Sequence, residues 1–170
     1  MTKTNKLGRF FRHLATDHGS VRRAFPQSAF ARIEAMIGEG EKLHRGQVRF
    51  VVEPALPPAR VLEGVTPRER ALDVFGLLRI WDTEENCGVL VYLLLADHDV
   101  EIVADRGIHA RVGGKAWQAV CRKMEAEFRR GRFVEGAETG LATINTILAE
   151  HYPREDGPRA NELPDRPVVL

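Results

Sequence analysis

The sequence predicts an α/β protein, namely a three-layer α/β/α sandwich with a small mixed sheet, preceded by an amino-terminal amphipathic helix. Residues 88–96 form a continuous apolar segment without alternation, which is typical of a strand buried on both faces. Gln47–Glu53 has a strand pattern, and a helical pattern separates it from the apolar segment. Because a strand, a crossover helix and a second strand follow in that order, we expect one right-handed parallel connection.

Composition favours a single domain in a reduced compartment. The chain has 170 residues, of which 44% are hydrophobic, and this is enough for one domain with its own core. The net charge of +1, without a helix-turn-helix or a zinc-ligand spacing, predicts no specific nucleic-acid partner. Cys87 and Cys121 are the only cysteines, and no run resembles a signal peptide, so a cytoplasmic location is expected. The longest apolar run, Val89–Ala96, is far shorter than the roughly 20 residues of a membrane-spanning helix.

Residues 1–24 are interpreted as a basic amphipathic arm. Apolar residues at helical spacing predict a short helix, with basic residues on its other faces. One interpretation is a helix packed on the domain with a solvated basic face. The other is an interfacial helix that places the protein peripherally on the inner membrane, with its aromatic pair in anionic lipid and its basic residues at the headgroups. The expected membrane contacts are Lys3, Lys6, Arg9, Phe10, Phe11 and Arg12.

Residues 25–152 are expected to form the α/β/α domain. Pro26 suits the first turn of a helix that carries Ile33 and Ile37 on one face. Gln47–Glu53 alternates as a strand does, and Pro57 and Pro58 end it because proline cannot donate to a ladder. Thr66 and Glu69 then form a capping box at the start of the crossover helix, whose apolar face runs from Ala71 to Leu78.

The second half of the domain is predicted to be a hairpin followed by two helices. Asp97–Asp99 supplies a turn that brings Val100–Val103 back beside the central strand. Apolar stripes over 117–128 and 137–148 predict two helices that cover the sheet. From Pro153 to the last residue, prolines and few large apolar residues predict a disordered tail, 153–170.

Carboxylates flank the central hairpin and predict a cation site. Ca²⁺ and Mg²⁺ prefer oxygen ligands, and four carboxylates lie just before the first strand of the hairpin and just after its second strand, at one edge of the sheet. The expected ligands are Asp82, Glu84, Glu85 and Asp105. The alternative is a solvated acidic loop. Arg106 and His109 follow directly and are expected to contact phosphate or another ligand, with an ordinary polar surface as the alternative.

Residues from Arg68 to about Tyr152 resemble the TPM domain family. The resemblance rests on NCGVLVYLLLADHDVEIVADRGI and on the later GRFVEGAETGL. The family's framework glycines correspond to Gly88, Gly107, Gly131 and Gly136. The resemblance implies a small α/β/α fold. It also implies a choice of roles, because some members are acid phosphatases, others bind calcium or another divalent ion, and many are membrane-tethered accessory proteins.

Three family carboxylates are replaced, by Asn86, His109 and Gly114. We therefore expect a non-catalytic accessory protein that binds an unknown protein partner or a divalent cation at the acidic edge of the sheet and docks on the cytoplasmic membrane face. The alternative is a metal-assisted phosphatase acting on a phosphomonoester. In it, a cation on Glu85 and Asp105 polarises the phosphoryl oxygen while Arg106 and His109 stabilise charge.

Overall fold

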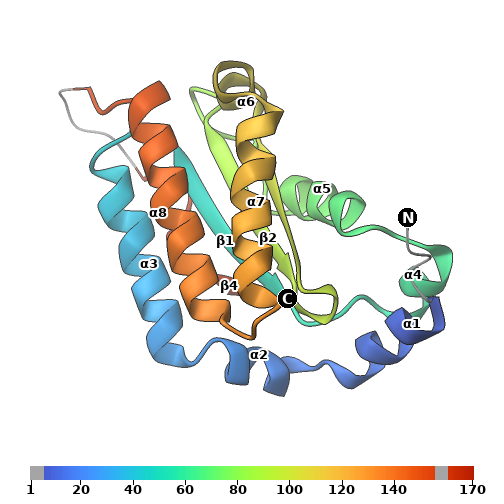
Figure 1. Ribbon diagram of the computed structural model, residues 1–170. Helices are drawn as coiled ribbons and strands as arrows, with labels where there is room; N and C mark the ends of the chain where they lie inside the picture. Colours follow the sequence, from blue (N-terminus) through green and yellow to red (C-terminus); the bar gives the residue numbers. More distant parts are fainter. Residues whose placement is uncertain (1–5, 156–160) are drawn as a thin grey trace.

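A four-stranded mixed sheet is the middle layer of the computed structural model, which describes residues 6–155 and 161–170 (Figure 1). Its strand order is β3-β2-β1-β4. The strands are β1 (Gln47–Glu53), β2 (Gly88–Leu94), β3 (Asp99–Ala104) and β4 (Val168–Val169). β1 runs parallel to β2 and β4, and β2 runs antiparallel to β3. The predicted parallel crossover and hairpin are therefore confirmed.

Helices cover both faces of this sheet, so the predicted α/β/α fold is confirmed. On one face lie α3 (Gln27–Glu41), α7 (Gly114–Phe128) and α8 (Phe133–His151), as Figure 1 shows. On the other lie α4 (Pro58–Glu63) and α5 (Pro67–Leu77). The remaining elements are α1 (Lys6–Ala15), α2 (His18–Ala24), the 3₁₀ turn η1 (Leu95–Asp97) and α6 (Arg106–Val112).

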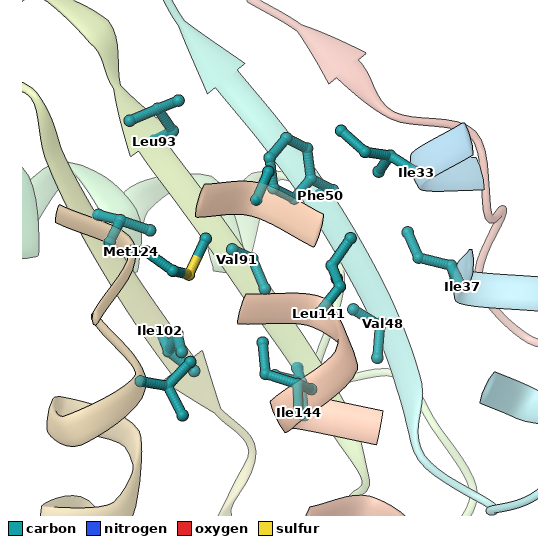
Figure 2. Close-up of a cluster of buried hydrophobic side chains, with 14 of the residues drawn as sticks. Ile33, Ile37, Val48, Phe50, Val91, Leu93, Ile102, Met124, Leu141 and Ile144 are labelled. Carbon is teal, nitrogen blue, oxygen red and sulfur yellow. The ribbon is translucent and has the colours of Figure 1, made fainter. Parts of the chain in front are cut away.

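Alternation along the two central strands divides the core into two clusters. Val48 and Phe50 of β1, with Val91 and Leu93 of β2, point toward α3, α7 and α8, where Leu141 meets them (Figure 2). The intervening side chains point the other way, toward α5. Every residue of β1 and β2 is buried. A strand covered on both faces needs no polar alternation, and this explains the continuous apolar run of β2.

The crossover from β1 to β2 begins with a helix that the sequence did not predict. Pro58 is the first residue of α4, where its missing N–H costs nothing, and Gly64 ends the helix with a φ of 83°. The predicted capping box is present at α5, where the Thr66 hydroxyl accepts from the Glu69 N–H and the Glu69 carboxylate accepts from the Thr66 N–H at 2.8 Å. β2 ends at Leu94, two residues before the predicted end, because the chain tightens into η1.

The amino-terminal segment is part of the folded domain. Val21 and Phe25 are 1% and 0% exposed within the cluster that α3 and α8 complete. His13 of α1 is 4% exposed. Removing residues 7–24 would therefore open the core, and α1 agrees with the interpretation of a helix packed on the domain.

The carboxyl-terminal segment is also ordered over the residues that the structure describes there, so the predicted disordered tail is wrong for 161–170. The Gln47 side-chain oxygen accepts from the N–H groups of Glu162 and Leu163, both at 2.8 Å. The Arg49 guanidinium donates to the carbonyls of Pro164 and Arg166. β4 then extends the sheet beside β1. Polar side chains of β1 therefore bind the backbone of this segment, and Leu163 is buried in the core cluster on the α5 side of the sheet. Composition does not reveal these contacts.

Candidate functional site

Asp105, one of the four predicted cation ligands, acts as the N-cap of α6. Its Oδ1 accepts from the Arg106 N–H at 2.7 Å, which satisfies one of the free N–H groups of the first turn. The residue is 8% exposed, and its Oδ2 has no partner among the described residues. The Arg106 Nε donates to the side-chain oxygen of Asn86 at 3.0 Å. Asp105 and Arg106 therefore fix the start of α6.

Two of the other three predicted ligands form ion pairs elsewhere, and the third is held through its backbone. Asp82 pairs with Arg79 at 2.8 Å, and Glu85 pairs with Arg45 at 2.8 Å. The Glu84 N–H donates to the carboxylate of Glu162, in the carboxyl-terminal segment. Within residues 6–155 and 161–170, no group of three or more His, Cys, Asp or Glu side chains is arranged to hold a metal ion. The four predicted ligands, as arranged in this structure, therefore do not form a binding site for the predicted Ca²⁺ or Mg²⁺.

The predicted ligand contacts Arg106 and His109 have different surroundings. Arg106 bonds to Asn86, whereas His109 lines a groove of about 450 Å³ formed by β3, α7 and their neighbours. Neither cysteine is an activated nucleophile. The Cys87 thiol is buried and donates to the Arg45 carbonyl, and burial raises the pKa of Cys121 to about 12.

Asp97 is the electrostatic centre that holds α1 on the domain. It lies in η1, just beyond the carboxyl end of β2, and its side chain is 10% exposed. The Arg9 guanidinium lies 2.9 Å from it, and the His13 Nε2 lies 3.2 Å from it. Burial alone would raise the pKa of Asp97, but the hydrogen bonds from His13 and Arg9 outweigh it and lower the pKa to about 2.

Further bonds fix the inner face of α1. The His13 Nδ1 accepts from the Leu56 N–H at 2.9 Å, and a second N–H of Arg9 reaches the Val65 carbonyl at 2.9 Å. Phe10 packs against the core cluster on the α5 side of the sheet. Arg9 and Phe10 therefore face the domain and are not free for the membrane contact that the sequence predicted. The sequence did not reveal this, because Asp97 lies 88 positions from Arg9 along the chain.

The outer face of α1 carries an exposed apolar stripe. Leu7, Phe11 and Leu14 are 63%, 58% and 55% exposed and follow each other at i, i+4 and i+7. Lys6 is exposed, and the Arg12 side chain is 52% exposed beside this stripe. Lys3 lies outside the described residues. α1 packs beside α4 at the rim of the molecule, away from α3 and α8 (Figure 1). We call Leu7, Phe11 and Leu14 the α1 stripe.

The helical spacing marked an amphipathic helix but did not show which apolar side chains stay exposed. The sequence assigned the membrane contact to Phe10 and Phe11, and the structure separates them, with Phe10 packed and Phe11 exposed. Leu7 and Leu14 belong to the stripe by the same i, i+4 and i+7 rule, so the signal was present in the sequence. In the described part of the chain, no helix is both long and apolar enough to span a bilayer.

Comparisons with known proteins agree on one fold. A family model described as the TPM domain matches residues 22–147, a range that begins after α1. Among solved structures, the NMR structure of the BA42 protein from the psychrophilic bacterium Bizionia argentinensis is similar, with a TM-score of 0.75 and 25% sequence identity. That likeness covers 86% of this chain and 95% of the BA42 chain. A search of curated proteins finds no match.

Proposed function

The chain belongs to the TPM domain family, and from this premise we propose that it is a non-catalytic accessory module that docks on an anionic membrane surface through α1. The α1 stripe is the observation that carries the proposal. Three large apolar side chains, each more than half exposed, lie in one row on a helix whose opposite face is fastened to the domain. Such a face, bordered by basic residues, is typical of a helix that lies in a membrane interface.

The energetics suit reversible docking. Full burial of a Leu or Phe side chain is worth about 1.5–3 kcal/mol, and each stripe residue has about half of its surface still to bury. Lys6 and Arg12 each add about 1 kcal/mol near an anionic surface. Because Arg9 and His13 already hold α1 in place, binding does not have to order the helix. We place this contact on the cytoplasmic face of the inner membrane.

A membrane fits the stripe better than the alternative of a protein groove. The stripe is a single row of three side chains, and the basic residues beside it are exposed, Lys6 as well as Arg12, whose side chain is 52% exposed even though it also lies 3.6 Å from Asp97. Among the described residues of α1 there is no acidic side chain, so nothing there opposes an anionic surface. We propose that the unknown protein partner expected from the sequence binds another face of the domain.

The metal-assisted phosphatase has no comparable support. Its cation would require Glu85 and Asp105 together, but Glu85 pairs with Arg45 while Asp105 caps α6. The buried Oδ2 of Asp105 is the one feature in its favour, and a single carboxylate oxygen is far fewer than the six ligands that Mg²⁺ or Ca²⁺ takes. We derive no catalytic step from this arrangement.

Vesicle co-sedimentation tests the proposal with the full chain. Wild type is compared with Leu7→Ser/Phe11→Ser on vesicles of phosphatidylglycerol mixed with phosphatidylcholine, and on phosphatidylcholine alone. The matched control is Leu43→Ser/Leu77→Ser, because these two leucines are 64% and 66% exposed and lie outside α1. We expect the α1 variant to bind the anionic vesicles at least about tenfold more weakly, a loss of about 1.4 kcal/mol. The control variant should bind the anionic vesicles with an affinity within about twofold of wild type.

Two results would overturn the proposal. One is equal partitioning of wild type and the α1 variant on anionic vesicles. The other is that wild type does not bind vesicles but self-associates in sedimentation velocity without lipid, and that Leu7→Ser/Phe11→Ser abolishes this self-association. In that case the stripe is an interface between two copies of the chain.

A further inference from the structure

A cavity of about 440 Å³ lies beside α1 at the carboxyl edge of the parallel strands. β1 and β2 both end there, at Glu53 and Leu94, and open α/β sheets commonly bind ligands outside the carboxyl ends of their strands. α1 covers part of this edge through the Arg12 bond to the Ala96 carbonyl. The remaining space is bounded by α1, α2, η1 and the connection between α7 and α8. Its main side chains are Arg12, Ser20, Arg23, Leu95, His98 and Phe133.

Cationic side chains supply the donors of this cavity. None of the described residues that line it is acidic, and Arg12, Arg23 and His98 all contribute. The two hydroxyls already donate elsewhere, Thr16 to the Arg12 carbonyl and Ser20 to the Asp17 carboxylate. An entering ligand therefore meets two guanidinium groups and one imidazole.

The guanidinium groups are held in place but are not used up. Arg12 donates through Nε to Ala96 at 3.3 Å, and its Nη2 lies 3.6 Å from Asp97. Arg23 donates one N–H to the Ser20 hydroxyl at 2.9 Å. Because a guanidinium carries five N–H donors in a planar fork, both arginines keep donors for a ligand oxygen.

We propose that this cavity binds the phosphate group of a phosphomonoester. Arginine pairs with phosphate through parallel charge-assisted bonds, and two arginines match a dianion better than a single carboxylate. Leu95 and Phe133 form an apolar wall that suits the organic part of such a molecule. The volume lies in the usual range for a small-molecule site. The same chemistry is found in a soluble phosphorylated metabolite and in a lipid headgroup with a terminal phosphate.

His98 provides an internal reporter. Its ring packs edge-on against Phe133, with centroids 5.2 Å apart. Burial lowers the pKa of His98, Arg12 and Arg129 lower it further, and Asp97 opposes them. Asp97 is itself paired with Arg9, so the guanidinium groups of Arg12 and Arg129 outweigh it at the ring. A phosphate dianion in the cavity adds negative charge beside the imidazole and should raise this pKa.

The test is an NMR titration of the full chain with inorganic phosphate and with glycerol 3-phosphate, at ionic strength held constant with sodium chloride. We expect saturable shifts of the amides of residues 15–24 and 95–99, and a His98 pKa higher by about half a unit when phosphate is bound. Arg23→Ala should weaken binding about tenfold. Arg22→Ala is the matched control, because this neighbouring exposed arginine does not line the cavity and should leave the affinity within about twofold.

Further arms separate the two sources of the phosphate. Leu7→Ser/Phe11→Ser should bind soluble phosphate as wild type does, since those residues lie outside the cavity, so this binding is independent of membrane docking. Binding of Arg23→Ala and Arg22→Ala to vesicles that contain phosphatidic acid is compared as well. If Arg23→Ala weakens binding to these vesicles but not to the soluble phosphates, the ligand is a lipid headgroup. Shifts that do not saturate, or that Arg22→Ala and Arg23→Ala weaken equally in every arm, would overturn the proposal.

Discussion

Neutralising Asp97 with Asp97→Asn should destabilise the domain by about 2 kcal/mol at pH 7. The fall of the pKa from its ordinary value of 3.8 to about 2 corresponds to about 2.4 kcal/mol, at about 1.36 kcal/mol for each pH unit. The side chain is only 10% exposed, so solvent screens this energy little. Asparagine has nearly the same shape and keeps an acceptor for Arg9, so the substitution removes the charge and leaves the packing.

The pH dependence of this effect has a defined direction. A carboxylate whose pKa is lower in the folded state stabilises that state above the ordinary pKa, and the contribution disappears as the pH falls toward the folded value. The difference between wild type and Asp97→Asn should therefore be complete above about pH 4 and should shrink as the pH approaches about 2.

Urea unfolding followed by far-ultraviolet circular dichroism measures this difference. The matched control is Asp82→Asn, which breaks the ion pair with Arg79 on a side chain that is 53% exposed and should change stability by no more than about 0.5 kcal/mol. A double-mutant cycle with Arg9→Gln isolates the pair and should give a coupling energy of about 1–2 kcal/mol. If Asp97→Asn costs no more than Asp82→Asn, or if the cost is independent of pH, Asp97 is not the anchor of α1.

Four more changes test other parts of the structure. Burial raises the pKa of Asp99 to about 7, and the charges of Glu101, Glu125 and Asp97 raise it further while Arg129 opposes them, so ionisation of Asp99 costs stability as the pH rises from about 4 to about 7. In urea titrations, Asp99→Asn should therefore be more stable than wild type by about 1–2 kcal/mol at about pH 8 and equally stable at about pH 4. No gain in stability at the higher pH would contradict this. A methyl group at Gly88 would overlap the Ile80 carbonyl, so Gly88→Ala should lower stability by about 3 kcal/mol or more in thermal melts, whereas Gly76→Ala, with open space around it, should be neutral or stabilising, and equal melts would refute the close packing. The Tyr92 hydroxyl donates to buried Glu53 at 2.6 Å, so Tyr92→Phe should cost about 1–3 kcal/mol in urea, and a neutral result would show that Arg70 alone satisfies Glu53. Millimolar Ca²⁺ or Mg²⁺, or a chelator, should move the melting temperature by no more than about 1 °C, whereas a saturable rise would show that ligands gather around Asp105 when a cation binds.

The sequence predicted the layers of the fold because its strongest local signals agree with the tertiary arrangement. The capping box at Thr66 and Glu69 and the unalternated run of β2 both report directly on structure, one on local hydrogen bonds and the other on burial of both strand faces. The short helix α4 was missed because it is stabilised at its ends, by Pro58 and Gly64, and shows little periodicity.

The candidate site was predicted less well because it depends on contacts between distant residues. Asp82, Glu84 and Glu85 are close in sequence to one another, but Arg45 and Glu162 engage two of the three from distant segments. Asp97 looked like an ordinary turn residue until α1 placed Arg9 and His13 beside it. The tail was misjudged for the same reason, because Gln47 and Arg49 fix it through backbone atoms that carry no sequence signal.

The central claim is that the outer face of α1 enters an anionic membrane while the rest of the domain stays outside. It is tested most directly by paramagnetic broadening of amide signals of the full chain on phosphatidylglycerol bicelles that carry a gadolinium-chelating lipid. We predict that broadening is strongest for residues 6–15 and weak for α3 and α8, which lie away from α1 in Figure 1. Uniform broadening, or broadening centred on another element while α1 is spared, would contradict the proposed docking.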